Sequence, residues 1–144
     1  MIRLKNLAAS GACAFFLGSA AFAQEPVPLA EELFTLPWVI ADFEGRSDIE
    51  YVTPPTFGIF EVADRDVGGD TPCAHSWNGK IDLDLPAVTI SEVEAFHSNE
   101  CPADRDTMTL LKLLEQVAAA RTGVDGLELV ASDGRRLMLL VAGG

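Results

Sequence analysis

Basic residues are scarce in this sequence of 144 residues: ten Lys and Arg stand against 22 Asp and Glu, for a formal charge of −12. Nucleic acids and anionic membrane surfaces both require a basic face on the protein, so this shortage argues against either as a partner. The chain has only two His, which leaves few ways to build a catalytic or metal-binding group. A hydrophobic fraction of 49% supports a packed core and excludes wholesale disorder.

The amino-terminal segment has the pattern of an export signal. Arg3 and Lys5 precede an uncharged stretch, Leu7 to Ala23, which ends in Ala-Phe-Ala. Small residues at the last and third-last positions suit signal peptidase, so we expect cleavage after Ala23. A retained span is less favoured because the stretch is rich in Ala, Gly and Ser, whereas a span needs roughly 20 strongly apolar residues. Lipidation of Cys13 is also less favoured, since the apolar run before it is shorter than the usual 7–15 residues.

Cleavage would leave residues 24–144, with eight Lys and Arg against 22 Asp and Glu. No second apolar run in them is long enough to span a membrane. We therefore expect an exported, monomeric protein of the periplasm. The chain divides into a signal peptide (1–23), a leader segment (24–35) and one folded domain (36–144).

Two cysteines remain after cleavage, Cys73 and Cys101. An even pair in a small exported domain predicts a disulfide, which would stabilise the fold by roughly 3.5 kcal/mol on the chain-entropy model. The alternative is a tetrahedral zinc site, since Cys73, His75, His97 and Cys101 offer four soft ligands. The spacing of His97 and Cys101 suits zinc, that of Cys73 and His75 is unusual, and export favours oxidation of the thiols.

The polarity pattern predicts a mostly β chain with one long helix. Strands are expected at 38–43, 49–53, 57–61, 81–85, 88–96, 127–130 and 137–141. Residues 64–70 are expected to form a polar turn, and Asn78-Gly79 a tight hairpin turn. Apolar residues at intervals of three and four predict a helix from about 104 to 121, with Gly123 as its stop.

Several features follow one another along the chain: Trp38-Val39-Ile40, Gly69-Asp70-Thr71-Pro72-Cys73, Asn78-Gly79, the strand to Leu85, Cys101, the helix through Leu114 and a closing hairpin. Over residues 36–142 this order resembles the META domain of heat-shock HslJ-like proteins. The resemblance implies an α+β fold, in which a curved antiparallel sheet (a partial barrel) packs on one major helix. It also implies a small envelope protein linked to stress and drug tolerance. We carry over the two cysteines and the architecture, and no catalytic residue.

Catalytic patterns in the sequence are weak. Ser76 follows His75, but no G-x-S-x-G elbow surrounds it. Asp82 and Asp84 would share one face of a strand, as the paired carboxylates of a glycosidase might, and solvated surface charge explains them as well. The acidic spacing that begins at Asp64 resembles a calcium loop but has His75, not Glu, at its twelfth position.

We therefore expect a non-enzymatic envelope protein without a cofactor, which binds a protein or a small apolar ligand and supports stress tolerance. One alternative is a small metal-dependent or hydrolytic enzyme that uses His75 and His97. Another is an inhibitor of a hydrolase, a role that small exported disulfide domains often have.

Overall fold

The computed structural model describes residues 27–46, 53–96 and 100–143. The expected signal peptide with Cys13 and its cleavage site, and most of the strand expected at 49–53, lie outside these residues. The elements are η1 (Glu31–Thr35), β1 (Trp38–Phe43), β2 (Thr56–Glu61), β3 (Asp66–Asp70), β4 (Ser76–Asp84), β5 (Ala87–Ala95), α2 (Asp104–Gln116), β6 (Ala119–Thr122), β7 (Leu127–Val130) and β8 (Arg136–Ala142). None of the helices in the described part is both long and apolar enough for a membrane crossing.

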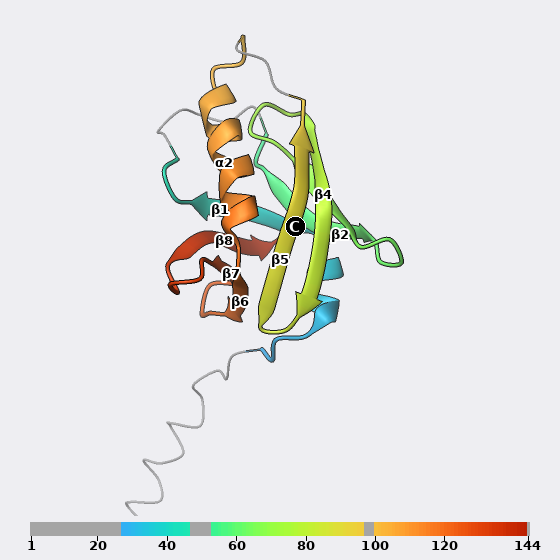
Figure 1. Cartoon of the computed structure of the whole chain (residues 1–144). Coiled ribbons are helices and arrows are strands. Elements are labelled where there is room, and N and C mark those ends of the chain that lie inside the picture. The colour runs from blue at the N-terminus through green and yellow to red at the C-terminus, as the bar shows by residue number, and fades with distance from the viewer. Residues whose placement is uncertain (1–26, 47–52, 97–99, 144) are drawn as a thin grey trace, which may run out of the picture.

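The eight strands form one closed antiparallel ring, in which each strand pairs with its sequence neighbours and β8 pairs with β1 (Figure 1). The narrowest pairing is between β5 and β6, where Ala87 faces Ala119. Next to this pair, the backbone N–H of Ala120 donates to the carbonyl of Pro86 at 2.9 Å. Beyond this seam α2 runs beside β5, so the helix covers the part of β5 that β6 does not reach (Figure 1).

Side chains fill the interior of the ring. Its largest fully buried side chains come from η1, α2 and six of the strands: Phe34, Phe57, Val67, Trp77, Val88, Leu110, Leu114, Leu127, Leu129, Leu137, Met138 and Leu140. Each contributes about 1.5–3 kcal/mol by leaving water. Phe34 belongs to η1, and the indole N–H of Trp38 donates to the carbonyl of Leu33 at 2.6 Å. The folded unit therefore begins before residue 36.

The expected α+β fold, a partial barrel packed on one major helix, is wrong. The protein is mostly β: eight antiparallel strands close into one ring, and α2 is the single α-helix of the described residues. Two segments expected as a turn and as part of the helix are strands β3 and β6. These two strands complete the ring.

Glycine in β3 has a packing role, although the pattern suggested a turn. A Cβ on Gly69 would lie 2.0 Å from the carbonyl oxygen of Thr56, and one on Gly68 would lie 2.6 Å from that of Trp77. Such close approach of backbones requires glycine within a strand.

The Asn78-Gly79 pair lies inside β4 and makes no hairpin turn. Gly79 pairs with Val67 of β3, and Asn78 pairs with Gly68. The turn between β4 and β5 falls instead at Leu85-Pro86. Pairing with distant strands thus overrides the local turn preference of Asn-Gly.

The helix α2 ends at Gln116, earlier than the expected end near residue 121. Alanine favours helix, yet the backbone N–H of Ala118 donates to the carbonyl of Val130 at 2.9 Å. Ala119 to Thr122 then pair with β7. The tertiary pairing that closes the ring therefore sets the end of the helix.

Candidate functional site

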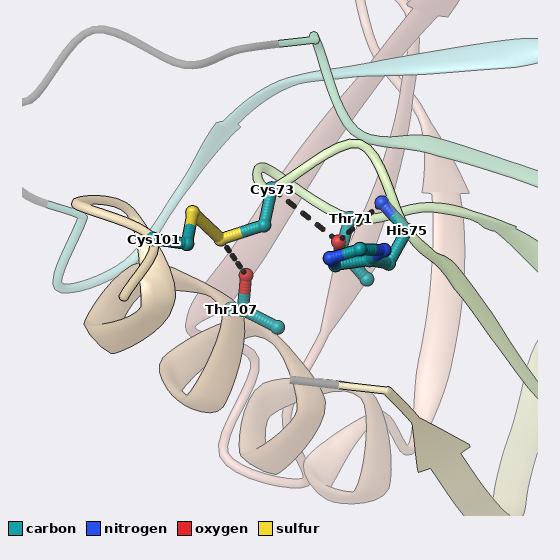
Figure 2. The surroundings of a disulfide bond; sticks show 5 residues. All are labelled: Thr71, Cys73, His75, Cys101 and Thr107. Atoms are coloured by element: carbon teal, nitrogen blue, oxygen red, sulfur yellow. Dashed lines mark hydrogen bonds between the residues drawn. A yellow bond between two sulfur atoms is a disulfide. The ribbon is translucent and has the colours of Figure 1, made fainter. Parts of the chain in front are cut away.

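A disulfide joins Cys73 to Cys101, with the two Cα atoms 6.1 Å apart. Cys73 lies in the loop between β3 and β4, and Cys101 precedes α2, so the bond ties this loop to the start of the helix (Figure 2). The hydroxyl of Thr107 on α2 donates to the sulfur of Cys73 at 3.5 Å. Because the two sulfurs are bonded to each other, neither is available as a thiolate ligand for the alternative zinc site.

The loop that carries Cys73 is organised by Thr71, which is fully buried. Its hydroxyl oxygen accepts hydrogen bonds from the backbone N–H groups of Cys73 at 3.3 Å and His75 at 3.2 Å (Figure 2). The backbone N–H of Thr71 donates to the carbonyl of His75 at 2.6 Å. Ala74 between them has a φ of +62°, in the left-handed region. The turn thereby fixes the backbone around the disulfide.

The residues of the enzyme hypothesis do not form a catalytic group in the described structure. The ring of His75 packs edge-to-face against Phe96, with ring centroids 4.7 Å apart. Ser76 is exposed at the start of β4, where it pairs with Asp70 of β3. His97 lies outside the described residues. Across residues 27–46, 53–96 and 100–143, no group of three or more His, Cys, Asp and Glu side chains could hold a metal ion.

The acidic residues of β3 and β4 behave as surface charges. Asp82 and Asp84 are exposed, and Asp82 forms an ion pair with Arg65. Asp66 lies 2.5 Å from the ammonium of Lys80, and this hydrogen bond raises the pKa of Lys80. Pairing with cations and exposure to solvent explain why acidic residues stand on these strands, without a role in glycosidase or calcium chemistry.

Exposed apolar side chains gather where η1 meets β2. Leu36, Phe60 and Val62 are 47%, 65% and 67% exposed. Two hollows of about 270 Å³ and 400 Å³ adjoin them, and both hollows are lined by Thr35 and Ile59. We call the area formed by Thr35, Leu36, Ile59, Phe60 and Val62, which line one or both of these hollows, the β2 apolar surface.

Strand alternation and two glycines build this surface. Phe57 is buried in the core while Phe60 lies on the outside of β2. A Cβ on Gly68 would lie 3.0 Å from the ring of Phe60, and one on Gly58 would lie 3.1 Å from the carbonyl of Leu36. The larger hollow therefore has glycine backbone in its floor and two apolar side chains beside it.

The smaller hollow combines an apolar lining with charged residues. Ile81 and Leu83 of β4 contribute to it beside Ile59 and Val62. Glu31 and Glu32 line it from η1, and Arg65 lines it from the turn between β2 and β3. The carboxylates on η1 are exposed. An apolar group can therefore be held here next to negative charge.

The β2 apolar surface was not predicted from the sequence. The signal for Phe60 was present, because alternation in 57–61 places aromatic residues on opposite faces of the strand. Leu36 precedes β1 and Val62 follows β2, and neither lies in a periodic pattern. Only the packing of η1 against β2 brings the three together.

On another side of the ring, basic and acidic side chains form a balanced ion-pair network. Arg121 lies 2.6 Å from Glu128, and Arg136 reaches both Glu128 at 3.5 Å and Asp42 at 3.4 Å. The hydrogen bond from Arg121 lowers the pKa of Glu128. These contacts link β1, β6, β7 and β8, so the charged side chains on that side pair with one another.

Comparisons with known proteins support the fold and give no function. No family model matches the sequence, and neither does any curated protein. An NMR structure of a protein from Burkholderia xenovorans is similar at a TM-score of 0.63 and 14% identity, over 84% of this chain and 93% of that one. A crystal structure of a DUF4847 family protein from Bacteroides vulgatus has a TM-score of 0.55 at 12% identity, over 78% of this chain and 96% of that one. At these identities the likeness concerns the fold alone.

Proposed function

We propose that this chain is an exported META/HslJ-like envelope protein that acts by binding, without catalysis or a cofactor, and supports stress tolerance. The β2 apolar surface is its binding site. The observation that carries the proposal is the gathering of three exposed apolar side chains beside two hollows. Contiguous exposed apolar area of this kind marks interaction sites in soluble proteins.

The filled interior directs the ligand to the outside of the ring. Trp77, Phe57 and Phe34 are almost completely buried, so the space that a hollow barrel would offer a ligand is taken by the core. In contrast, Leu36, Phe60 and Val62 remain largely in contact with water. Covering them would stabilise a complex by about 25 cal/mol for each Å² of apolar area removed from water.

Charge and the disulfide fit the proposed compartment and oligomeric state. A disulfide is compatible with an oxidising space such as the periplasm. Strong negative charge makes copies of the chain repel one another, which favours a monomer and leaves the surface free for a different partner.

Nile red, a neutral apolar dye, tests the location of the site. Residues 24–144 are titrated with the dye as wild type, Phe60→Ser and Phe96→Ser. Phe96 is the matched control because it is also 65% exposed and lines a different hollow, between β5 and α2. We expect saturable binding that Phe60→Ser weakens by at least about tenfold and Phe96→Ser leaves unchanged.

Folding is checked on each variant from its urea midpoint, which exposed substitutions should hardly change. Absence of saturable dye binding would overturn the proposal. An equal loss in Phe60→Ser and Phe96→Ser would also overturn it, since the binding would then not be centred on the β2 apolar surface.

A further inference from the structure

The charges of this protein are unequally distributed over the ring. From η1 and from β2 through β4 with their connecting turn at 62–65, eight carboxylates stand against two basic residues, Arg65 and Lys80. The carboxylates are Glu31, Glu32, Glu61, Asp64, Asp66, Asp70, Asp82 and Asp84. The side built from β1, β6, β7 and β8 is nearly balanced by its ion-pair network. The side that bears the β2 apolar surface therefore carries more excess negative charge than the side built from β1, β6, β7 and β8.

The two basic residues on that side already have carboxylate partners. Arg65 pairs with Asp82, and Lys80 pairs with Asp66 at 2.5 Å. Within the described ranges, no ion pair holds Glu31, Glu32 or Glu61. Glu31 and Glu32, which line the smaller hollow, and Glu61, which lies between Phe60 and Val62 in the chain, are thus available to an incoming cation.

We propose that the β2 apolar surface docks a cationic segment of a partner protein. An apolar side chain of that segment enters the hollow lined by Ile59 and Ile81, and flanking Lys or Arg side chains pair with Glu31, Glu32 and Glu61. This inference rests on the proposed binding function and adds the chemical class of the partner.

Shape and charge together favour this occupant. Two hollows of about 270 Å³ and about 400 Å³ share Thr35 and Ile59 in their linings, and two neighbouring hollows suit a peptide segment with one anchoring side chain. The surrounding carboxylates would repel an acidic segment and speed the approach of a basic one. Because the cations near the hollow are already paired, an anionic ligand has no free partner among the described side chains of this surface.

Two fluorescein-labelled amphipathic peptides test the inference by anisotropy. One consists of Leu and Lys, and its counterpart has Glu at every Lys position. We expect the Leu-Lys peptide to bind, the Leu-Glu peptide to bind at least about tenfold more weakly, and the difference to shrink between about 20 and about 300 mM salt.

Matched variants separate a local effect from net charge. The triple variant Glu31→Gln, Glu32→Gln, Glu61→Gln is compared with Glu92→Gln, Glu115→Gln, Asp125→Asn, which removes the same charge elsewhere. We expect the first set to weaken binding of the Leu-Lys peptide by at least about tenfold and the second by less than about threefold. Phe60→Ser should weaken it as strongly, and Phe96→Ser should not.

The outcomes distinguish this inference from the function beneath it. If both triple variants weaken binding equally, or if both peptides bind equally, the cationic partner is wrong. If Nile red still binds in a manner that depends on Phe60 while the Leu-Lys peptide does not bind, the cationic partner is wrong and the apolar binding site stands. If neither probe depends on Phe60, both proposals fail.

Discussion

Thr71 holds the backbone around the disulfide in place through its buried hydroxyl. It lies between β3 and β4, where the chain must turn back within a few residues, and it accepts from both Cys73 and His75. The sequence places Thr71 beside Cys73, but the loop that carries both is tied by the disulfide to Cys101, 28 positions after Cys73. Neighbouring residues alone could not predict its role.

Replacing Thr71 by Val should lower the free energy of unfolding by about 1–3 kcal/mol, since the buried N–H groups of Cys73 and His75 lose an acceptor. Urea denaturation of wild type and variant measures the change. Thr89→Val is the control, because Thr89 is exposed on β5 and the change should stay within about 0.5 kcal/mol. Equal effects of the two substitutions would contradict the role of Thr71.

Glu128 supplies a test that depends on pH. Its pKa in the folded state lies below the usual value of a glutamate because Arg121 donates a hydrogen bond to it, so ionised Glu128 stabilises the fold above that usual value. This contribution disappears as the pH falls through the folded pKa. At neutral pH the free energy of unfolding of Glu128→Gln should therefore be lower than that of wild type by up to about 1 kcal/mol. This difference should vanish in acid.

Urea midpoints of wild type and Glu128→Gln, measured at neutral pH and at successively lower pH, check this expectation. A difference that stays constant into acid would mean that the ion pair with Arg121 does not stabilise the fold.

At the scale of elements, the sequence predicts those whose pattern is local. The spacing of Met108, Leu111 and Leu114 predicts the helix, and alternation predicts the strand of Ile81 and Leu83. The end of α2 was not predictable in this way, because Ala118 pairs with Val130 across the ring. The pair Gly68-Gly69 suggested a turn, but these glycines are required by the close backbone of other strands, which the local sequence does not show.

The link between the β3–β4 loop and α2 depends on one covalent bond. Cys73 and Cys101 are separated by 28 positions in sequence. On the chain-entropy model, a disulfide that closes a loop of that size stabilises the folded state by about 3–4 kcal/mol. The double variant Cys73→Ala, Cys101→Ala should lose about this much in urea denaturation.

Reduced wild type is the matched comparison, because it lacks the bond and keeps both side chains. A loss below about 1 kcal/mol in both samples would contradict the structural role of the bond. Intact mass with and without reductant checks that the oxidised sample contains it.

At the scale of the whole molecule, closure of the ring could not be predicted from polarity. Pairing of β1 with β8 joins residues about 100 positions apart, such as Val39 and Val141. Alternating strands are equally compatible with a partial barrel. The distribution of charge could not be predicted for the same reason: composition shows the excess of acid, and only the fold shows that the side with the β2 apolar surface carries more of it than the side built from β1, β6, β7 and β8.

The most direct test of the account is a titration of ¹⁵N-labelled residues 24–144 with the Leu-Lys peptide, followed by amide chemical shifts. The account predicts shift changes that cluster on η1, β2 and the turn at residues 62–65, and that are lost in Phe60→Ser. A cluster centred on Phe96 and α2 or on the turn at residues 123–126, or no saturable change at all, would contradict it.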